Sequence, residues 1–159
     1  MPRFPMTPRG LNKLRRALRE IQAERPKLAL VIEAARELGD LSENAEYHAA
    51  KERQSFLEGK MMELEAKIGQ ADVIDPTKLK GTRVVFGATV ELEDCDSGDK
   101  SRYMIVGDDE ADVKGGKISI SSPVARGLIN KHEGDEVQVR TPGGMREYEI
   151  MKVSFGYID

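Results

Sequence analysis

The chain contains a single cysteine, Cys95, and no tryptophan, and aromatic residues make up only 5% of its 159 positions. One cysteine cannot form an internal disulfide, so the sequence excludes a disulfide-stabilised scaffold and fits a reducing compartment. Charged residues reach 33%. So much charge with so few aromatic side chains argues against one large compact core, and favours long solvated helices joined to a small globular unit.

Long hydrophobic runs are also absent from the sequence. No apolar stretch approaches the roughly 18 residues that a membrane-spanning helix needs. The first ten residues lack the apolar core of a signal peptide. We therefore expect a soluble, cytoplasmic protein without a membrane partner. The net charge of −3 predicts no bulk attraction to nucleic acid.

The motifs of common enzyme classes are missing as well. The sequence has no glycine-rich phosphate loop, no Ser-His-Asp set and no cluster of metal-ligating residues. The acidic run that includes Asp94 fails the EF-hand calcium template, because Gly98 falls one position too early and no glutamate closes the loop. We expect no cofactor or metal that the chain binds stably alone.

Two apolar seams dominate the first half of the chain. They span residues 11–35 and 47–71, with apolar positions spaced alternately by three and four. This spacing is typical of coiled-coil helices. Thr7 and Pro8 predict the start of the first helix, and Gly39 predicts its end.

The two seams predict an antiparallel hairpin. Opposing positions then have residue numbers that add to 78 or 79, as Leu14 and Leu64 do, and the polar seam members Arg25 and Gln54 fit the same register. Because each seam has an intramolecular partner, we expect a monomer. Pro26 lies inside the first helical pattern and removes one backbone hydrogen bond, so it predicts a kink or an interruption there.

The segment GDLSENAEYHAAKE, residues 39–52, lies at the predicted turn. It places two carboxylates, Asp40 and Glu43, at the far end of the hairpin. Asp-x-x-Glu before a helix is also a capping box, with Asp40 as the N-cap. Both interpretations stay open, because a cap would also hold the acids in place for a chemical role. Two carboxylates are too few to hold Mg²⁺, which prefers six oxygen ligands, so any metal here must be shared with a partner.

Three basic residues lie near this turn: Arg36, Lys51 and Arg53. Their side chains are candidates for contact with a phosphate chain. An ordinary solvated surface is the alternative for all three.

The second half changes from a period of 3.6 to a period of 2. Residues 76–81 read as a linker between domains 1–75 and 82–159. A short helix is expected from Ser122 and Pro123 to about Lys131. Strands are expected at Thr82–Phe86, Ala88–Glu93, Ser101–Val106, Lys117–Ile120, Glu136–Arg140 and Arg146–Ser154. The predicted fold class is α+β, with a long antiparallel coiled-coil hairpin followed by a small, mostly antiparallel sheet and one helix.

Several blocks of the sequence resemble one family, and they occur in that family's order. Besides residues 39–52, they are VVFGATVEL (84–92), IVGDDEAD (105–112) and SPVARGLI (122–129) followed by TPGG. From Met6 to about Val153, the chain resembles the bacterial transcript cleavage factors of the Gre family, most closely its A type. Both acids of the turn stand where the family has them.

The resemblance implies a function. Such factors bind bacterial RNA polymerase, insert the coiled coil through its secondary channel and stimulate the polymerase's own hydrolysis of the RNA 3′ end in backtracked, arrested complexes. Asp40 and Glu43 would complete the site of a second Mg²⁺ shared with the polymerase. Arg36 and Lys51 become candidates for contact with the extruded RNA. The protein itself would be a cofactor of this activity and not an enzyme.

The resemblance also implies an FKBP-like C-terminal domain that docks on the polymerase, with Ser121, Ser122 and Pro123 in the docking loop. Three other functions stay open. A non-cleaving regulator of the same channel would share this shape, although the Asp-x-x-Glu pair favours cleavage. A prolyl isomerase would need an apolar pocket lined by aromatic residues. The few aromatic residues of this half are needed to fill its core, which argues against such a pocket. A coiled-coil adaptor would need a free seam.

Overall fold

The computed structural model describes residues 3–39 and 44–158. The chain divides into two compact units. One spans residues 11–70, and the other combines the described residues up to 10 with those from 71 onward. The predicted domains, residues 1–75 and 82–159, stay a prediction. A division into compact units does not show whether either domain folds independently. Within the described ranges, none of the helices combines the length and apolarity that crossing a bilayer requires.

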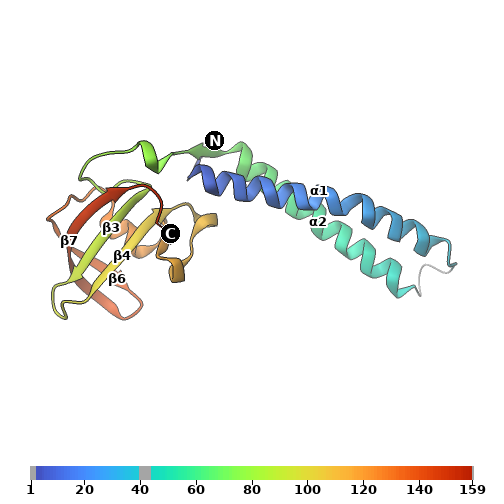
Figure 1. Cartoon of the computed structure of the whole chain (residues 1–159). Coiled ribbons are helices and arrows are strands. Elements are labelled where there is room, and N and C mark those ends of the chain that lie inside the picture. The colour runs from blue at the N-terminus through green and yellow to red at the C-terminus, as the bar shows by residue number, and fades with distance from the viewer. Residues whose placement is uncertain (1–2, 40–43, 159) are drawn as a thin grey trace. The chain divides into compact units, whose positions relative to one another are not determined.

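The first unit is a hairpin of two long helices. Helix α1 (Pro8–Arg36) and helix α2 (Ala45–Gly69) run antiparallel and side by side (Figure 1). Their buried side chains all come from the two predicted seams: Leu14, Ile21, Ile32, Ala35, Ala50, Leu57 and Leu64. The predicted hairpin is therefore confirmed, because burial follows the alternating spacing of three and four.

The register of the hairpin agrees with the prediction to within a residue or two. The guanidinium of Arg53 donates to the carboxylate of Glu24 at 3.0 and 3.2 Å, and 24 and 53 add to 77. The predicted polar layer is confirmed in position, since Arg25 and Gln54 line the same groove. Each has its own partner, however: Arg25 Nη1 lies 3.6 Å from a methionine sulfur, and Gln54 accepts from Lys51 at 3.1 Å.

The helix continues through Pro26 without an interruption. Of the two outcomes expected there, an interrupted helix is thus wrong. Pro26 lies on the exposed side of α1, so water can reach the carbonyl that its missing N–H leaves unbonded. The hairpin packing on the opposite face is not disturbed, and this packing stabilises most of the helix.

The second unit contains a five-stranded sheet with the strand order β5-β4-β3-β7-β6. Every neighbouring pair is antiparallel except β4 with β5, which is parallel. The strands are β3 (Ala88–Asp94), β4 (Lys100–Val106), β5 (Lys117–Ser119), β6 (Glu136–Thr141) and β7 (Gly144–Phe155). The predicted α+β fold class is confirmed.

Helix α3 (Pro123–Leu128) packs against β6 and covers one face of this sheet. The core between them is aliphatic and includes Val90, Leu128 and Ile150, each buried to 1% exposure or less. The helix ends three residues earlier than predicted. Its exit is marked by Asn130, whose φ of 69° is left-handed and therefore ends the helical path.

The strand expected at Thr82–Phe86 is wrong. This segment forms only one isolated bridge, between Arg83 and His132. The backbone of Val84 bonds instead to the loop after α3, at 2.7 Å to Lys131 and 2.8 Å from Asn130. Val84 still fills the core with 0% exposure, which explains the alternating pattern that suggested a strand.

Several short elements were not expected from the sequence. Strand β1 (Phe4–Met6) pairs in parallel with β2 (Ala71–Val73). Among the described residues, the second unit also contains the short 3₁₀ turns η2 (Pro76–Lys78), η3 (Asp108–Glu110) and η4 (Val113–Gly115).

Candidate functional site

The two acids predicted to act chemically, Asp40 and Glu43, lie outside the described residues. Their surroundings are described on both sides. Helix α1 ends at Arg36, Gly39 has a φ of 109°, and α2 begins at Ala45. In the chain, both acids fall between the end of α1 and the start of α2.

The N-cap of α2 is Asn44. Its Oδ1 accepts a hydrogen bond from the N–H of Tyr47 at 3.0 Å, and its Nδ2 donates to the carbonyl of Ala35 at 3.0 Å. The cap of α2 is thus Asn44, and the predicted capping box of Asp40 with Glu43 lies outside the described residues. An asparagine side chain offers both an acceptor and a donor, so it caps α2 and ties it to the last turns of α1.

The cap at Asn44 bears on how this segment is interpreted from the sequence. Asparagine is among the preferred N-cap residues, so the signal was present in the sequence, but the Asp-x-x-Glu spacing obscured it. With Asn44 as the cap of α2, both interpretations of Asp40 and Glu43 stay predictions.

The three basic candidates near the turn have different environments. Arg36 is exposed in the last turn of α1, where the helix dipole favours a cation. Lys51 is half-buried, and its Nζ donates to Gln54 at 3.1 Å. Arg53 is paired with Glu24 at 3.0 Å and also lies 5.2 Å from the ring centre of Phe56. Arg36 and Lys51 are thus better placed for an external phosphate than Arg53.

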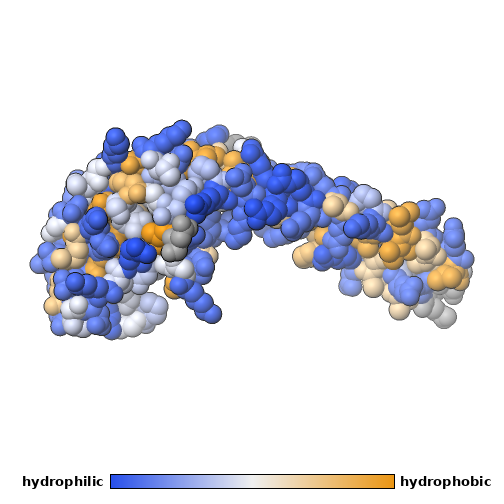
Figure 2. Space-filling view, viewed as in Figure 1, coloured by the Kyte–Doolittle hydropathy of each residue, from blue (hydrophilic) through white to orange (hydrophobic). Residues whose placement is uncertain are grey.

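The hairpin also exposes apolar side chains near its turn. Figure 2 shows hydrophobic residues gathered on the hairpin toward the end where its helices are joined. Leu30 is 67% exposed, Val31 50% and Leu38 74%. A helix segment that is apolar on its outer face as well as its inner face is typical of a surface that a partner covers.

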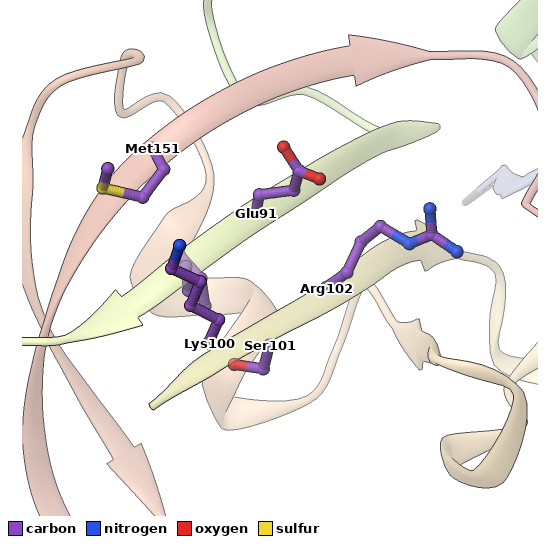
Figure 3. Close-up of a pocket in the computed structure, with 6 residues that line it drawn as sticks. Glu91, Lys100, Ser101, Arg102 and Met151 are labelled. Atoms are coloured by element: carbon purple, nitrogen blue, oxygen red, sulfur yellow. The ribbon is translucent and has the colours of Figure 1, made fainter. Parts of the chain in front are cut away.

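Metal-ligating groups and surface depressions also bear on what the described residues could do chemically. Within residues 3–39 and 44–158, no group of three or more His, Cys, Asp or Glu side chains is placed to hold a metal ion. A depression on the sheet is lined by Glu91, Leu92, Lys100, Ser101, Arg102 and Met151. In Figure 3 the charged side chains come from the neighbouring strands β3 and β4. This lining lacks the aromatic side chains that a prolyl isomerase pocket would need.

The predicted docking residues lie around the start of α3. Ser122 is its N-cap and accepts from the N–H of Ala125 at 3.2 Å, and exposed Pro123 is the first helical residue. Ser121 donates to Asp108 Oδ1 at 2.8 Å, and Ser119 bonds to both of these side chains. The sequence did not point to Asp108 as a partner of these serines, because its contacts join residues more than ten positions apart.

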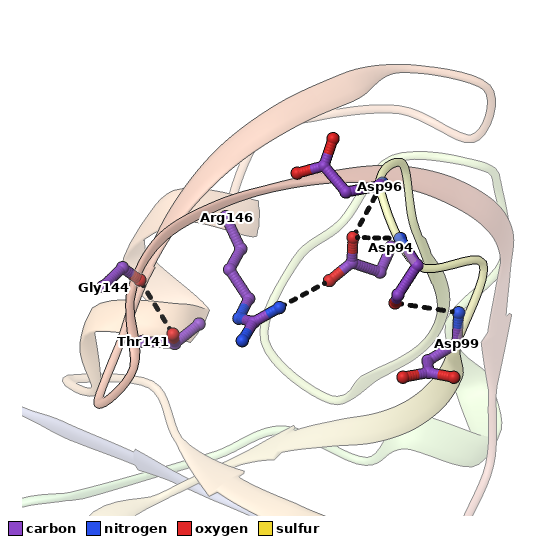
Figure 4. Close-up of polar contacts among 7 residues, drawn as sticks. Asp94, Asp96, Asp99, Thr141, Gly144 and Arg146 are labelled. Atoms are coloured by element: carbon purple, nitrogen blue, oxygen red, sulfur yellow. Dashed lines mark hydrogen bonds and ion pairs between the residues drawn. The ribbon is translucent and has the colours of Figure 1, made fainter.

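A second polar cluster stabilises the hairpin of β3 and β4 (Figure 4). The Oδ1 of Asp94 accepts from the N–H groups of Asp96 at 2.8 Å and Ser97 at 3.2 Å, and its Oδ2 accepts from Arg146 at 3.1 Å. These backbone bonds, and then Arg146, hold the pKa of Asp94 below its ordinary value. Partial desolvation and then nearby carboxylates raise the pKa of Cys95, so this thiol is not activated as a nucleophile.

Comparison with known proteins agrees with this architecture. Residues 4–73 match the family described as "Transcription elongation factor, N-terminal", and residues 79–155 match "Transcription elongation factor, GreA/GreB, C-term". The chain is 58% identical over 156 residues to "Transcription elongation factor GreA" of Anaeromyxobacter sp. (strain K), covering 98% of this chain and 94% of the relative. The protein of the same name from Psychrobacter cryohalolentis is 54% identical, covering 98% and 99%.

Among solved structures, the chain is similar to the GreA factor homolog 1 (Gfh1) protein of Thermus thermophilus. The identity is 25%, the match covers 95% of this chain and 98% of that protein, and the TM-score is 0.44. A similarity at that TM-score carries no argument about function. The two family matches and the identity to relatives over nearly their full length show that this chain belongs to the GreA/GreB family of transcription elongation factors.

Proposed function

We propose that the protein is a transcript cleavage factor. It binds bacterial RNA polymerase, extends its helical hairpin through the secondary channel and stimulates the polymerase's own hydrolysis of the RNA 3′ end in backtracked complexes, so that elongation resumes. In this role it is a cofactor of the polymerase and not an enzyme. The observation that carries the proposal is the long hairpin of a family member with Asp40 and Glu43 in the segment between its helices, where Asn44 already serves as the cap.

The chemistry of the two acids requires a partner. Asp40 and Glu43 would supply carboxylate oxygens to a Mg²⁺ that the polymerase also ligates, since two carboxylates do not complete a site for this ion. Such a Mg²⁺ would supply a lower pKa for the attacking water and stabilisation of charge on the phosphate. The acids would also orient that water or accept its proton.

The rest of the hairpin suits insertion into a partner. The exposed Leu30, Val31 and Leu38 would be covered by the walls of the channel, which removes apolar surface from water. Arg36 and Lys51 would contact phosphates of the extruded RNA. Arg53 is the weaker candidate, because it would first leave Glu24, although an exposed ion pair of this kind contributes only about 0.2–1 kcal/mol.

The globular unit would dock outside the channel through Ser121, Ser122 and Pro123. We further propose that the free protein is a cytoplasmic monomer, since the seams of α1 and α2 bury their apolar side chains against each other. A concentration-dependent increase in sedimentation coefficient would contradict the monomer.

The test uses a stalled, backtracked polymerase complex with labelled RNA and Mg²⁺. The parent protein should accelerate cleavage of the RNA 3′ end. Asp40→Asn combined with Glu43→Gln should keep the affinity for polymerase but lower the rate at saturation by about 100-fold or more, because it removes an interaction made at the reacting centre.

A matched control is Glu37→Gln combined with Glu46→Gln. It removes two exposed carboxylates from the same end of the hairpin, and its cleavage rate should equal that of the parent. If the acid-free variant cleaves as fast as the parent, the role of the two acids is wrong. If the parent binds without accelerating cleavage, the protein is the non-cleaving regulator of the same channel.

A further inference from the structure

The 3₁₀ turn η3 contacts two separate parts of its unit through two neighbouring carboxylates. Glu110 bonds to the start of helix α1, and Asp108 bonds to the serines that precede α3. The turn belongs to the segment GDDE, residues 107–110. The proposed roles of Asp40 and Glu43, and of the docking residues 121–123, give this segment no function.

Glu110 satisfies the polar groups at the beginning of α1. Its Oε1 accepts from the N–H of Thr7 at 2.8 Å, and its Oε2 accepts from the Thr7 hydroxyl. The same hydroxyl oxygen accepts from the N–H of Gly10 at 3.2 Å as the N-cap of the helix. Thr7 has 0% exposure, so water cannot replace Glu110 as its partner.

Two glycines lie directly against this contact. A Cβ added at Gly107 would lie 2.6 Å from the backbone carbonyl oxygen of Pro5. The approach of η3 to the chain before α1 therefore depends on glycine at position 107. A Cβ added at Gly10 would lie 2.3 Å from Cδ of Glu110, so that flexible side chain would have to move.

Asp108 holds the opposite side of the turn. Its Oδ1 accepts from Ser121 at 2.8 Å and also bonds to Ser119. The Ser119 hydroxyl in turn accepts from the N–H of Ser121 at 3.1 Å. One carboxylate thus sets the conformation of the residues directly before Ser122 and Pro123.

We propose that η3 is a positioning element of the cleavage factor, with Asp108 preparing the docking loop and Glu110 fixing the first turn of α1. The inference rests on the proposed function. Helix α1 is uninterrupted over 29 residues, which is a length of about 44 Å. Asp40 and Glu43 follow shortly after this helix in the chain, so the bonds that hold its first turn act on the element that carries them. A displacement of about 1 Å at reacting groups can already cost about 100-fold in rate.

The two carboxylates should consequently affect different steps. Asp108→Ala should raise the dissociation constant for polymerase about 10-fold and leave the cleavage rate at saturation unchanged. Glu110→Ala should leave that constant within about twofold of the parent and lower the saturated rate about 10-fold or more. Glu110→Gln, which keeps an acceptor for the N–H of Thr7, should recover much of the rate. Glu133→Ala is a matched control, because it removes an exposed carboxylate of the same unit.

A second variant protects the test against simple unfolding. Gly10→Ala keeps both carboxylates but pushes Glu110 away, and alanine favours the helix itself. It should reproduce the lowered saturated rate while the thermal midpoint stays within a few degrees of the parent. The proposal is overturned if Glu110→Ala and Gly10→Ala both cleave at the parental rate at saturation, or if Asp108→Ala binds like the parent. If the parent protein itself stimulates no cleavage, the proposed function has failed instead.

Discussion

Replacing Asn44 tests how the end of the hairpin is held together. Asn44→Ala removes the cap bond to the N–H of Tyr47 and the bond to the carbonyl of Ala35, both 3.0 Å long. Loss of an N-cap costs about 1 kcal/mol, and loss of a neutral hydrogen bond costs about 1 kcal/mol more. The free energy of unfolding of the hairpin should therefore fall by about 2 kcal/mol.

Asn44→Asp separates the two contributions. Aspartate keeps an acceptor for the helix N–H but has no donor for the carbonyl of Ala35. The expected loss is about 1 kcal/mol, because the cap survives and a carboxylate at a helix N-terminus is favourable. Urea unfolding followed by the helical circular dichroism signal measures both variants.

Asn12→Ala is a suitable control for these measurements. Asn12 is exposed in the first turns of α1, so its replacement should change the free energy of unfolding by no more than about 0.5 kcal/mol. The cleavage assay adds a functional measurement, in which Asn44→Ala should be slower than Asn44→Asp at saturation. If Asn44→Ala unfolds within about 0.3 kcal/mol of the parent, the double role of this side chain is refuted.

Two further predictions concern stability. Leu57→Ala should lower the free energy of unfolding of the hairpin by about 2–5 kcal/mol, because Leu57 is 2% exposed at the centre of its seam. Urea unfolding should show little change for Leu30→Ala, whose side chain is 67% exposed, and equal losses in the two variants would disprove the seam assignment. The fold lowers the pKa of Asp94 from its ordinary value of 3.8. The ionised carboxylate therefore stabilises the fold at pH values above 3.8, and this stabilisation is lost as the pH falls from 3.8 through the lower pKa of the folded state. Asp94→Asn should thus have a lower thermal midpoint than the parent at pH 7, and the difference should shrink as the pH falls below about 4; a difference that is constant with pH would contradict the role of the charge.

The site was only partly predictable from the sequence. The positions of Asp40 and Glu43 between two helices followed from the seams on either side of them. The identity of the cap did not, because Asp40 and Asn44 both carry cap signals within five residues. The structure decides for Asn44 through its bond to the N–H of Tyr47, and the added bond from Asn44 to Ala35 exists only once α1 and α2 lie side by side.

The partners of the 3₁₀ turn could not be predicted at all. Thr7 and Glu110 are separated by 103 positions, and neither residue type indicates the other. Nothing in the local pattern of residues 82–86 distinguishes a strand from a buried connection either. That outcome depends on the loop after α3, which bonds to the backbone of Val84.

The sequence by itself determined the two long helices, their antiparallel pairing and five of the six strands expected in the sheet. Those features depend on periodicity, which is local: a spacing of three and four, or of two, decides which face of an element is apolar. The tertiary structure alone decided the pairing of β1 with β2, the bond from Asn44 to Ala35 and the bonds of Glu110 and Asp108. These depend on the path by which the chain brings distant residues together, and a pattern read along the sequence carries no information about that path.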